Sequence, residues 1–116
     1  MERIGIEKQL SETALTNIEC ISYTSPIDVF TTLTKLVVLN DTDDSVEVEI
    51  YIRRNKLRDI LICNTNIPPN SRFDINNIGI IIESSEMVIA KQNSMVGVDL
   101  IICGIQDMTT QVLSLI

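Results

Sequence analysis

The sequence predicts an all-β protein: an antiparallel β-sandwich or jelly roll of about eight strands, with an N-terminal arm and a C-terminal apolar extension. Three observations lead to this prediction. The 116 residues suffice for about one domain with a single core. The chain holds 20 Ile, 9 Val and 10 Thr but only 2 Ala, and β-branched side chains favour strands over helices. Short apolar runs separated by turn-forming residues recur roughly every 8–12 residues, as in sandwiches.

The first half of the chain begins with an arm over residues 1–19, which is polar with scattered Ile and Leu that give only a ragged helical period. A first strand is expected at residues 19–23. A turn follows at 25–28, where proline presets φ and aspartate can bond the nearby backbone. Residues 31–40 are expected to form the next strand, and the loop at 40–45 is rich in turn formers.

Residues 46–53 give the clearest strand pattern in the chain. Apolar and polar side chains alternate without a break over these eight residues. A period of two places one face of the strand in the core and the other in water. The side chains predicted to be buried are Val46, Val48, Ile50 and Ile52.

The second half of the chain continues the same spacing of strands and turns. Two prolines, Pro68 and Pro69, remove backbone donors and end one strand, while Asn76 and Asn77 are expected to form a turn. A sandwich domain is therefore expected over residues 20–107, with 108–116 as an extension or last strand. The expected strands are 57–64, 72–75, 79–82, 87–92 and 98–106.

Composition excludes several kinds of chemistry. The chain has no His and no Trp, so a His-ligated zinc site, a Ser-His-Asp triad and a Cys-His dyad are impossible. Its formal net charge is −7, which disfavours a general nucleic-acid binder because phosphate contacts need a basic surface. No pair of carboxylates stands out as an acid/base couple. We expect no enzymatic activity and no cofactor.

Three smaller features bear on metals, on location and on disulfides. Asp41, Asp43 and Asp44 are a calcium candidate, but the spacing lacks the central Gly and the closing Glu, which favours an ordinary hairpin loop. The N-terminus shows no apolar signal region, and no apolar stretch is long enough to span a bilayer. The three cysteines lie far apart and are expected to be reduced, buried thiols, with a disulfide as the alternative.

Candidate interface residues fall into three groups. A basic hairpin tip is either a solvated turn or a docking patch for an acidic partner. The C-terminal residues are strongly apolar, so they either complete the chain's own sheet or pair with a neighbour. The N-terminal arm offers apolar anchors on a polar background. These residues are Arg53, Arg54, Lys56 and Arg58; Val112, Leu113, Leu115 and Ile116; and Ile4, Ile6 and Leu10.

The order of short motifs resembles a known family. Tyr23-Thr24-Ser25-Pro26 is followed by the strand ending at Asn40, then by Ile67-Pro68-Pro69-Asn70-Ser71 and Ile78-Gly79-Ile80-Ile81-Ile82-Glu83. In this order, over roughly residues 20–107, the segments resemble small β-sandwich structural proteins of tailed bacteriophages. The turn at residues 83–86 departs from the usual pattern of that family.

The resemblance implies a structural protein of a virion, attached to capsid, neck or tail proteins in a decoration or accessory role. It implies a location in the virion after synthesis in the host cytoplasm, and no catalysis. The acidic net charge and the short apolar stretches predict no nucleic-acid partner and no membrane. Symmetric self-association, as a trimer or ring, needs only one repeated patch. The alternative is a carbohydrate- or cell-surface-binding module, which requires aromatic platforms that four scattered rings supply poorly.

Overall fold

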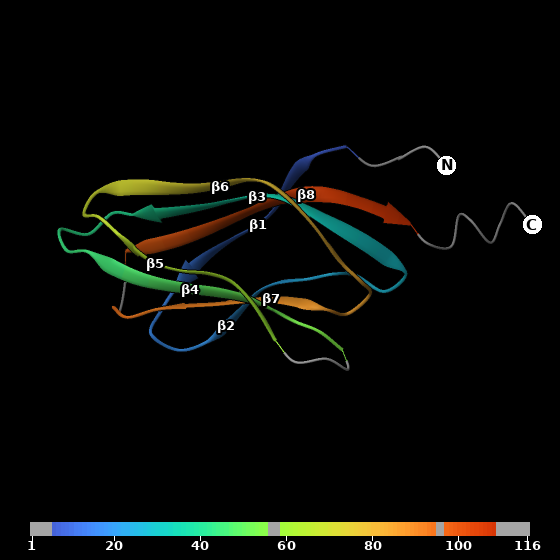
Figure 1. Ribbon diagram of the computed structural model, residues 1–116, viewed down its shortest axis with the longest axis horizontal. Helices are drawn as coiled ribbons and strands as arrows, with labels where there is room; N and C mark the ends of the chain where they lie inside the picture. The colour runs from blue at the N-terminus through green and yellow to red at the C-terminus, as the bar shows by residue number, and fades with distance from the viewer. Residues whose placement is uncertain (1–5, 56–58, 95–96, 109–116) are drawn as a thin grey trace, which may run out of the picture.

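Eight antiparallel strands in two sheets make up the computed structural model, which describes residues 6–55, 59–94 and 97–108. One sheet has the order β1-β8-β3-β6 and the other β2-β7-β4-β5, and the two lie face to face (Figure 1). The chain changes sheet at every connection except the β4–β5 hairpin, which is the jelly-roll arrangement. The predicted fold class is confirmed. The strands are β1 (Lys8–Leu15), β2 (Cys20–Thr24), β3 (Val29–Asn40), β4 (Val46–Arg53), β5 (Ile60–Ile67), β6 (Ser71–Ile82), β7 (Met87–Gln92) and β8 (Val98–Met108).

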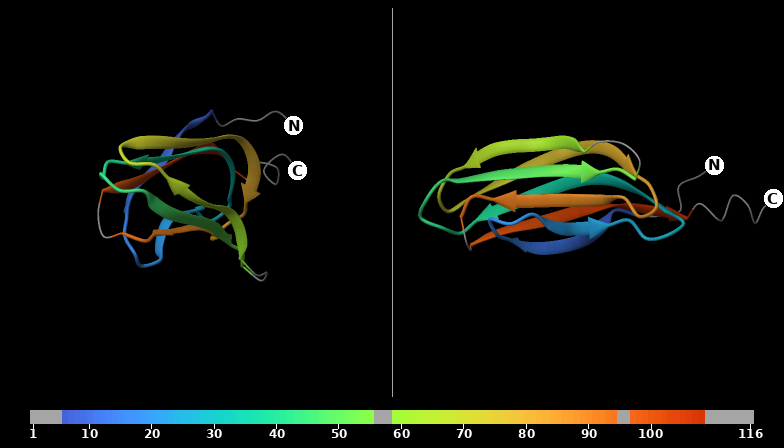
Figure 2. Two further views of the ribbon diagram at one scale, coloured as in Figure 1. Left: turned by 60° about the vertical axis from the view of Figure 1, so that its left-hand side comes forward. Right: turned by 90° about the horizontal axis from the view of Figure 1, so that it is seen from below.

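Strand β4 lies in the middle of the second sheet, between β5 and β7 (Figure 2). Its alternating pattern places Val46, Val48, Ile50 and Ile52 in the core with no more than 1% of each residue exposed. This confirms the predicted register. Tyr51, on the opposite face, is also buried, because polar side chains of the outer surface cover its ring.

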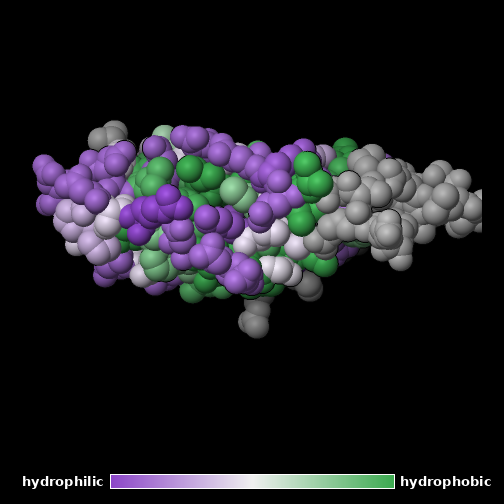
Figure 3. Space-filling view, turned by 90° about the horizontal axis from the view of Figure 1, so that it is seen from above, coloured by the Kyte–Doolittle hydropathy of each residue, from purple (hydrophilic) through white to green (hydrophobic). Residues whose placement is uncertain are grey.

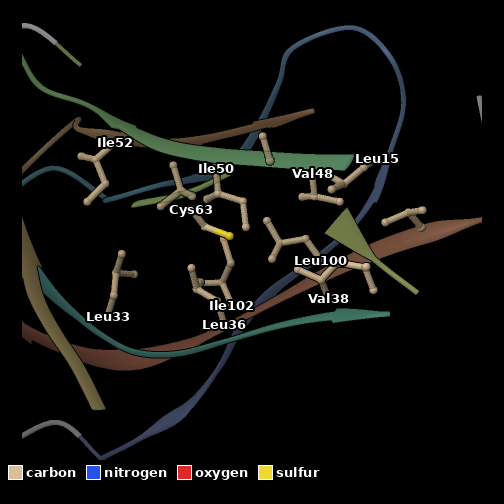
Figure 4. Packing of buried hydrophobic residues seen from close by; sticks show 14 of the residues in the cluster. Leu15, Leu33, Leu36, Val38, Val48, Ile50, Ile52, Cys63, Leu100 and Ile102 are labelled. Atoms are coloured by element: carbon tan, nitrogen blue, oxygen red, sulfur yellow. The ribbon is translucent and has the colours of Figure 1, made fainter. Parts of the chain in front are cut away.

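The core fills the space between the two sheets. Figure 4 shows side chains of β4 pointing towards side chains of β3 and β8 from the facing sheet. Leu, Ile and Val supply nearly all of it, in agreement with the composition. The cluster consists of Leu15, Leu33, Leu36, Val38, Val46, Val48, Ile50, Ile52, Cys63, Ile67, Ile82, Val88, Ala90, Val98, Leu100 and Ile102.

The N-terminal region differs from the predicted arm. Lys8–Leu15 form an edge strand that pairs with β8, from Lys8 opposite Gly104 to Leu15 opposite Val98. The register shifts between Gln9 and Ser11, so the apolar residues of this segment do not alternate regularly. One face of an edge strand is solvated, which accounts for the polar composition, while Leu15 is buried in the core. Residues 1–5 lie outside the described residues.

Strand β6 also differs from the prediction, because it runs without a break where a turn was expected. Asn77 and Gly79 have φ values of 55° and 68°, and they are accommodated inside the strand as an irregularity opposite β3. The register of β3 shifts between Leu33 and Lys35 against both of its neighbours. A conformation that resembles a turn in the sequence is therefore a bulge that bends the sheet.

Strand β8 continues past the predicted end of the sandwich, as far as Met108, which pairs with Val29 at the start of β3. The same end of the molecule carries the β4–β5 hairpin and the β6–β7 turn (Figure 1). The predicted extension at 108–116 lies, apart from Met108, outside the described residues. The end of the sandwich where β8 finishes brings together residues that are far apart in the sequence.

Candidate assembly surface

A buried carboxylate, Glu86, organises the end of the sandwich where β8 finishes. It closes the β6–β7 turn, in which the amide of Glu86 donates to the carbonyl of Glu83 at 3.0 Å and Ser85 has a φ of 70°. Only 5% of Glu86 is exposed. A charged group buried to this extent requires partners, because desolvation disfavours its ionised form.

The partners of Glu86 come from two different connections. Arg54, on the β4–β5 hairpin, donates to Oε1 at 2.7 Å, and the amide of Asn55 donates to Oε2 at 3.3 Å. The amide of Glu83 also donates to Oε1, at 2.8 Å. Burial by itself raises the pKa of Glu86, but these hydrogen bonds and the Arg54 charge outweigh it and hold the pKa below 4.5. The carboxylate therefore stays ionised and ties the hairpin to the turn.

The hairpin tip is also fixed to the β6 side of the turn through backbone carbonyls. Arg54 donates to the carbonyl of Ile81 at 2.9 Å, and the side-chain amide of Asn55 donates to the carbonyl of Ser84 at 3.1 Å. Arg54 is thus largely occupied within the molecule. Its predicted role as an interface residue stays a prediction, and the contacts instead give it a role in shaping this surface.

These contacts frame an apolar hollow of about 580 Å³. Three half-exposed apolar side chains from three different strands line it: Phe30 of β3, Ile60 of β5 and Ile81 of β6. Figure 3 views the outer face of the first sheet, which is largely hydrophilic with hydrophobic patches, one of them towards the end at the right. The remaining lining residues are Thr32, Arg54, Glu83, Glu86 and Asp107.

A second, polar hollow of about 690 Å³ adjoins the first and shares Thr32 and Ile81 with it. It lies along the bulge in β6, where Asn77 and Gly79 contribute to its wall. The hydroxyl oxygen of Thr34, in the bulge of β3, is buried without a hydrogen-bond partner. The two hollows therefore meet at Thr32 and Ile81, the first with apolar side chains from three strands and the second lined mainly by polar residues.

The predicted basic patch is divided between two environments. Arg53 lies on the outer face of the second sheet, 3.1 Å from Asp59 and 3.5 Å from Glu19, with its guanidinium 5.6 Å from the Tyr51 ring centre. Burial, together with the hydrogen bond to Glu19, raises the pKa of Tyr51 to about 12. Arg53 is therefore neutralised by two carboxylates. Lys56 and Arg58 lie outside the described residues.

The structure describes only two of the remaining predicted interface residues. Ile6 is 80% exposed and is free to act as an anchor, whereas Leu10 contacts the core above Gly104. Leu10 therefore already contributes to the fold. The predicted anchors Ile4, Val112, Leu113, Leu115 and Ile116 lie outside the described residues.

The acidic loop before β4 is organised by Asn40 rather than by its carboxylates. The Asn40 amide donates to carbonyls of Asp44 and of the segment at 67–68, and its oxygen accepts from Thr42. Asp43 accepts from the side chain of Asn70. No three metal-ligating side chains come together within the described ranges, and no helix in them is long and apolar enough to cross a membrane.

The cysteines are free thiols in three separate places. Cys63 belongs to the core, and burial raises the pKa of its thiol. Cys20 and Cys103 are half-buried on β2 and β8. Of the four aromatic rings, only Phe30 is exposed, so no set of neighbouring rings forms a stacking platform.

Sequence reasoning did not single out the residues that make the hollow. Phe30, Ile60 and Ile81 each belong to an ordinary apolar run, and nothing in the sequence distinguishes them from core residues. Arg54 and Glu86 are 32 residues apart, and only the topology brings them together. A glutamate in a turn otherwise rich in serine offers no signal that it is buried.

No protein-family model matches the sequence, and neither does any curated protein. Among solved structures, a subunit of the disulfide-linked pili that form Bacillus endospore appendages is similar, with a TM-score of 0.57 at 10% identity over 93% of this chain and 91% of that one. This similarity supports the jelly-roll fold.

Two other solved structures overlap more weakly. A protein of infectious bursal disease virus has a TM-score of 0.47 at 6% identity, covering 92% of this chain and 34% of its own. The Anabaena sensory rhodopsin transducer has a TM-score of 0.44 at 13% identity, covering 66% and 83%. Neither adds to the argument.

Proposed function

We propose that the chain is a non-enzymatic structural protein of a tailed-phage virion, which self-associates and attaches to capsid, neck or tail proteins. The observation that carries this proposal is the apolar hollow at the end of the sandwich. Its apolar side chains come from three strands and it is held by a buried ion pair, so it is a fixed concave surface rather than a mobile loop.

The chemistry of the surface supports attachment rather than catalysis. The carboxylate at the hollow, Glu86, accepts three hydrogen bonds from its own chain and has its pKa lowered, which is the opposite of what a general acid needs. The exposed apolar side chains offer contact area without reactive groups. An assembly protein needs this combination of a rigid scaffold and an apolar contact surface.

The order of motifs in the sequence resembles that of small β-sandwich proteins of tailed bacteriophages. This resemblance supports the virion as the place where the chain assembles. The jelly roll agrees with that expectation, since capsid domains commonly use this fold. A fold alone does not determine a function, so the proposal depends on assembly behaviour.

Sedimentation velocity of the purified full chain over a concentration series tests the proposed class of function. A self-associating structural protein gives species larger than the 13.0 kDa monomer, whose fraction rises with concentration. A strictly monomeric chain that binds oligosaccharides on a glycan array would overturn the proposal in favour of a carbohydrate-binding module.

A further inference from the structure

We propose that the hollow beside Phe30, Ile60 and Ile81 receives the apolar residues that follow Met108 in a second copy of the chain. This inference rests on the proposed function and deepens it, because it names the two surfaces through which copies associate. It assigns an occupant to the hollow and a binding site to the C-terminal segment.

The hollow has the properties of a docking site for apolar side chains. The exposed fractions of Phe30, Ile60 and Ile81 are 41%, 42% and 50%, and the three side chains surround a single concavity. Apolar residues scattered singly over a surface are ordinary, but a group of them around one concave site marks a place of contact. The volume of about 580 Å³ lies within the range of roughly 300–1,000 Å³ found for ligand pockets.

The charged residues around the hollow favour an occupant without acidic side chains. Among the described residues, the charged side chains that line the hollow are one cation, Arg54, and three carboxylates, Glu83, Glu86 and Asp107. An acidic segment would be repelled. The sequence after Met108 has no charged side chain and supplies Val112, Leu113, Leu115 and Ile116. This segment therefore matches the hollow in both polarity and charge.

The occupant docks through its side chains rather than by adding a strand to β6. Arg54 already donates to the carbonyl of Ile81, and Asn55 donates to that of Ser84. These bonds take up backbone acceptors where β6 ends. Strand addition needs such acceptors to be available, so this end of β6 is a poor template for it.

The geometry of β8 favours a second copy over the chain's own segment. Asp107 lines the hollow, and Met108 still pairs with Val29, so β8 runs past the hollow rather than into it. A tight reversal directly after Met108 is disfavoured, because residues 108–111 contain no Gly, Pro, Asn, Asp or Ser. The β6–β7 turn, whose residues Glu83 and Glu86 line the hollow, lies at the same end of the sandwich as the end of β8 (Figure 1), so two copies meeting end to end can exchange segments.

Cysteine trapping tests the contact directly. In a background of Cys20→Ser and Cys103→Ser, with the buried Cys63 retained, we place Ile81→Cys and Leu113→Cys on separate copies and oxidise their mixture with copper phenanthroline. We expect a disulfide-linked heterodimer. The control replaces Ile81→Cys by Ile21→Cys, because 58% of Ile21 is exposed against 50% of Ile81 and it also lies on an edge strand. Equal yields from the two pairs would overturn the proposal.

A double variant distinguishes the two sources of the segment. With Ile81→Cys and Leu113→Cys on one chain, dilute oxidation gives a linked dimer if the segment belongs to a second copy. A monomer closed by an internal disulfide at every concentration would show that the chain's own segment fills the hollow, and the proposal would be wrong.

Sedimentation of Ile81→Glu and Ile21→Glu separates failure of this contact from failure of the proposed function. We expect Ile81→Glu to weaken self-association at least about ten-fold, as loss of an interface anchor does, and Ile21→Glu to leave it unchanged. Circular dichroism checks that both variants fold. Unchanged association in Ile81→Glu overturns the docking site but leaves self-association standing, whereas a wild-type chain that stays monomeric overturns both.

Discussion

Replacing Glu86 with alanine should destabilise the fold by about 3–5 kcal/mol. The change removes one partner of a buried ion pair and leaves Arg54, whose side chain is 16% exposed, without its countercharge. It also removes the acceptor of the Glu83 and Asn55 amides. Glu86→Gln keeps an amide oxygen that can accept from one of these two amides. The loss of stability in this variant should therefore be smaller, about 1–3 kcal/mol.

Urea unfolding followed by circular dichroism measures these differences. The matched control is Glu83→Gln, three residues earlier in the same turn, whose exposed side chain should change stability by no more than about 0.5 kcal/mol. Equal losses from Glu86→Gln and Glu83→Gln would refute the role given to the buried carboxylate.

The difference in stability between the wild type and Glu86→Gln should depend on pH. The pKa of Glu86 in the folded protein lies below 4.5, so its stabilisation is complete above that pH and is lost as the pH falls through the folded-state pKa. The stability gap between the wild type and Glu86→Gln should therefore be constant from about pH 5 to 7 and should narrow below about pH 4.5. A gap of the same size at pH 3 and pH 7 would contradict the pKa lowering.

Further substitutions and a chelator test the core, the bulged sheet and the expectation that no metal is required. Ile50→Ala should cost about 2–4 kcal/mol by leaving a cavity, whereas Glu49→Ala should cost little; equal losses in urea titrations would mean that the register of β4 is wrong. Gly104→Ala should cost about 1–3 kcal/mol, because the added carbon would lie 2.5 Å from the Thr32 carbonyl oxygen. Gly79→Ala meets no neighbour but has a φ of 68°, so a loss of about 1–2 kcal/mol is expected; no loss would contradict the bulge geometry. A chelator should leave the melting temperature unchanged, and a fall of several degrees would indicate a metal site at the acidic loop.

The strands with a buried face on a regular period were predictable from the sequence. The bounds of β4 and β7 match the predicted ranges, because apolar side chains in them face a core that excludes polar residues. Strands at the edge of a sheet were harder to predict. Strand β1 has one solvated face and a bulge at residues 9–11, so its apolar residues lose the period on which the prediction depended.

The bulge in β6 and the candidate assembly surface were not predictable, for two different reasons. Asn76-Asn77 has turn chemistry, and only pairing with β3 shows that the left-handed residue is absorbed within a strand. The hollow depends on contacts between Arg54, Glu86 and Ile81, which are brought together by the crossing of the chain between sheets. Local sequence patterns carry no information about such long-range juxtapositions.

Targeted mass spectrometry of gradient-purified virus particles, from cultures that produce the chain, tests the proposed structural role most directly. The proposed structural role predicts that the chain is present in several copies per particle, at a fixed ratio to the other particle proteins. A chain that is abundant in infected cells but absent from the purified particles would contradict it.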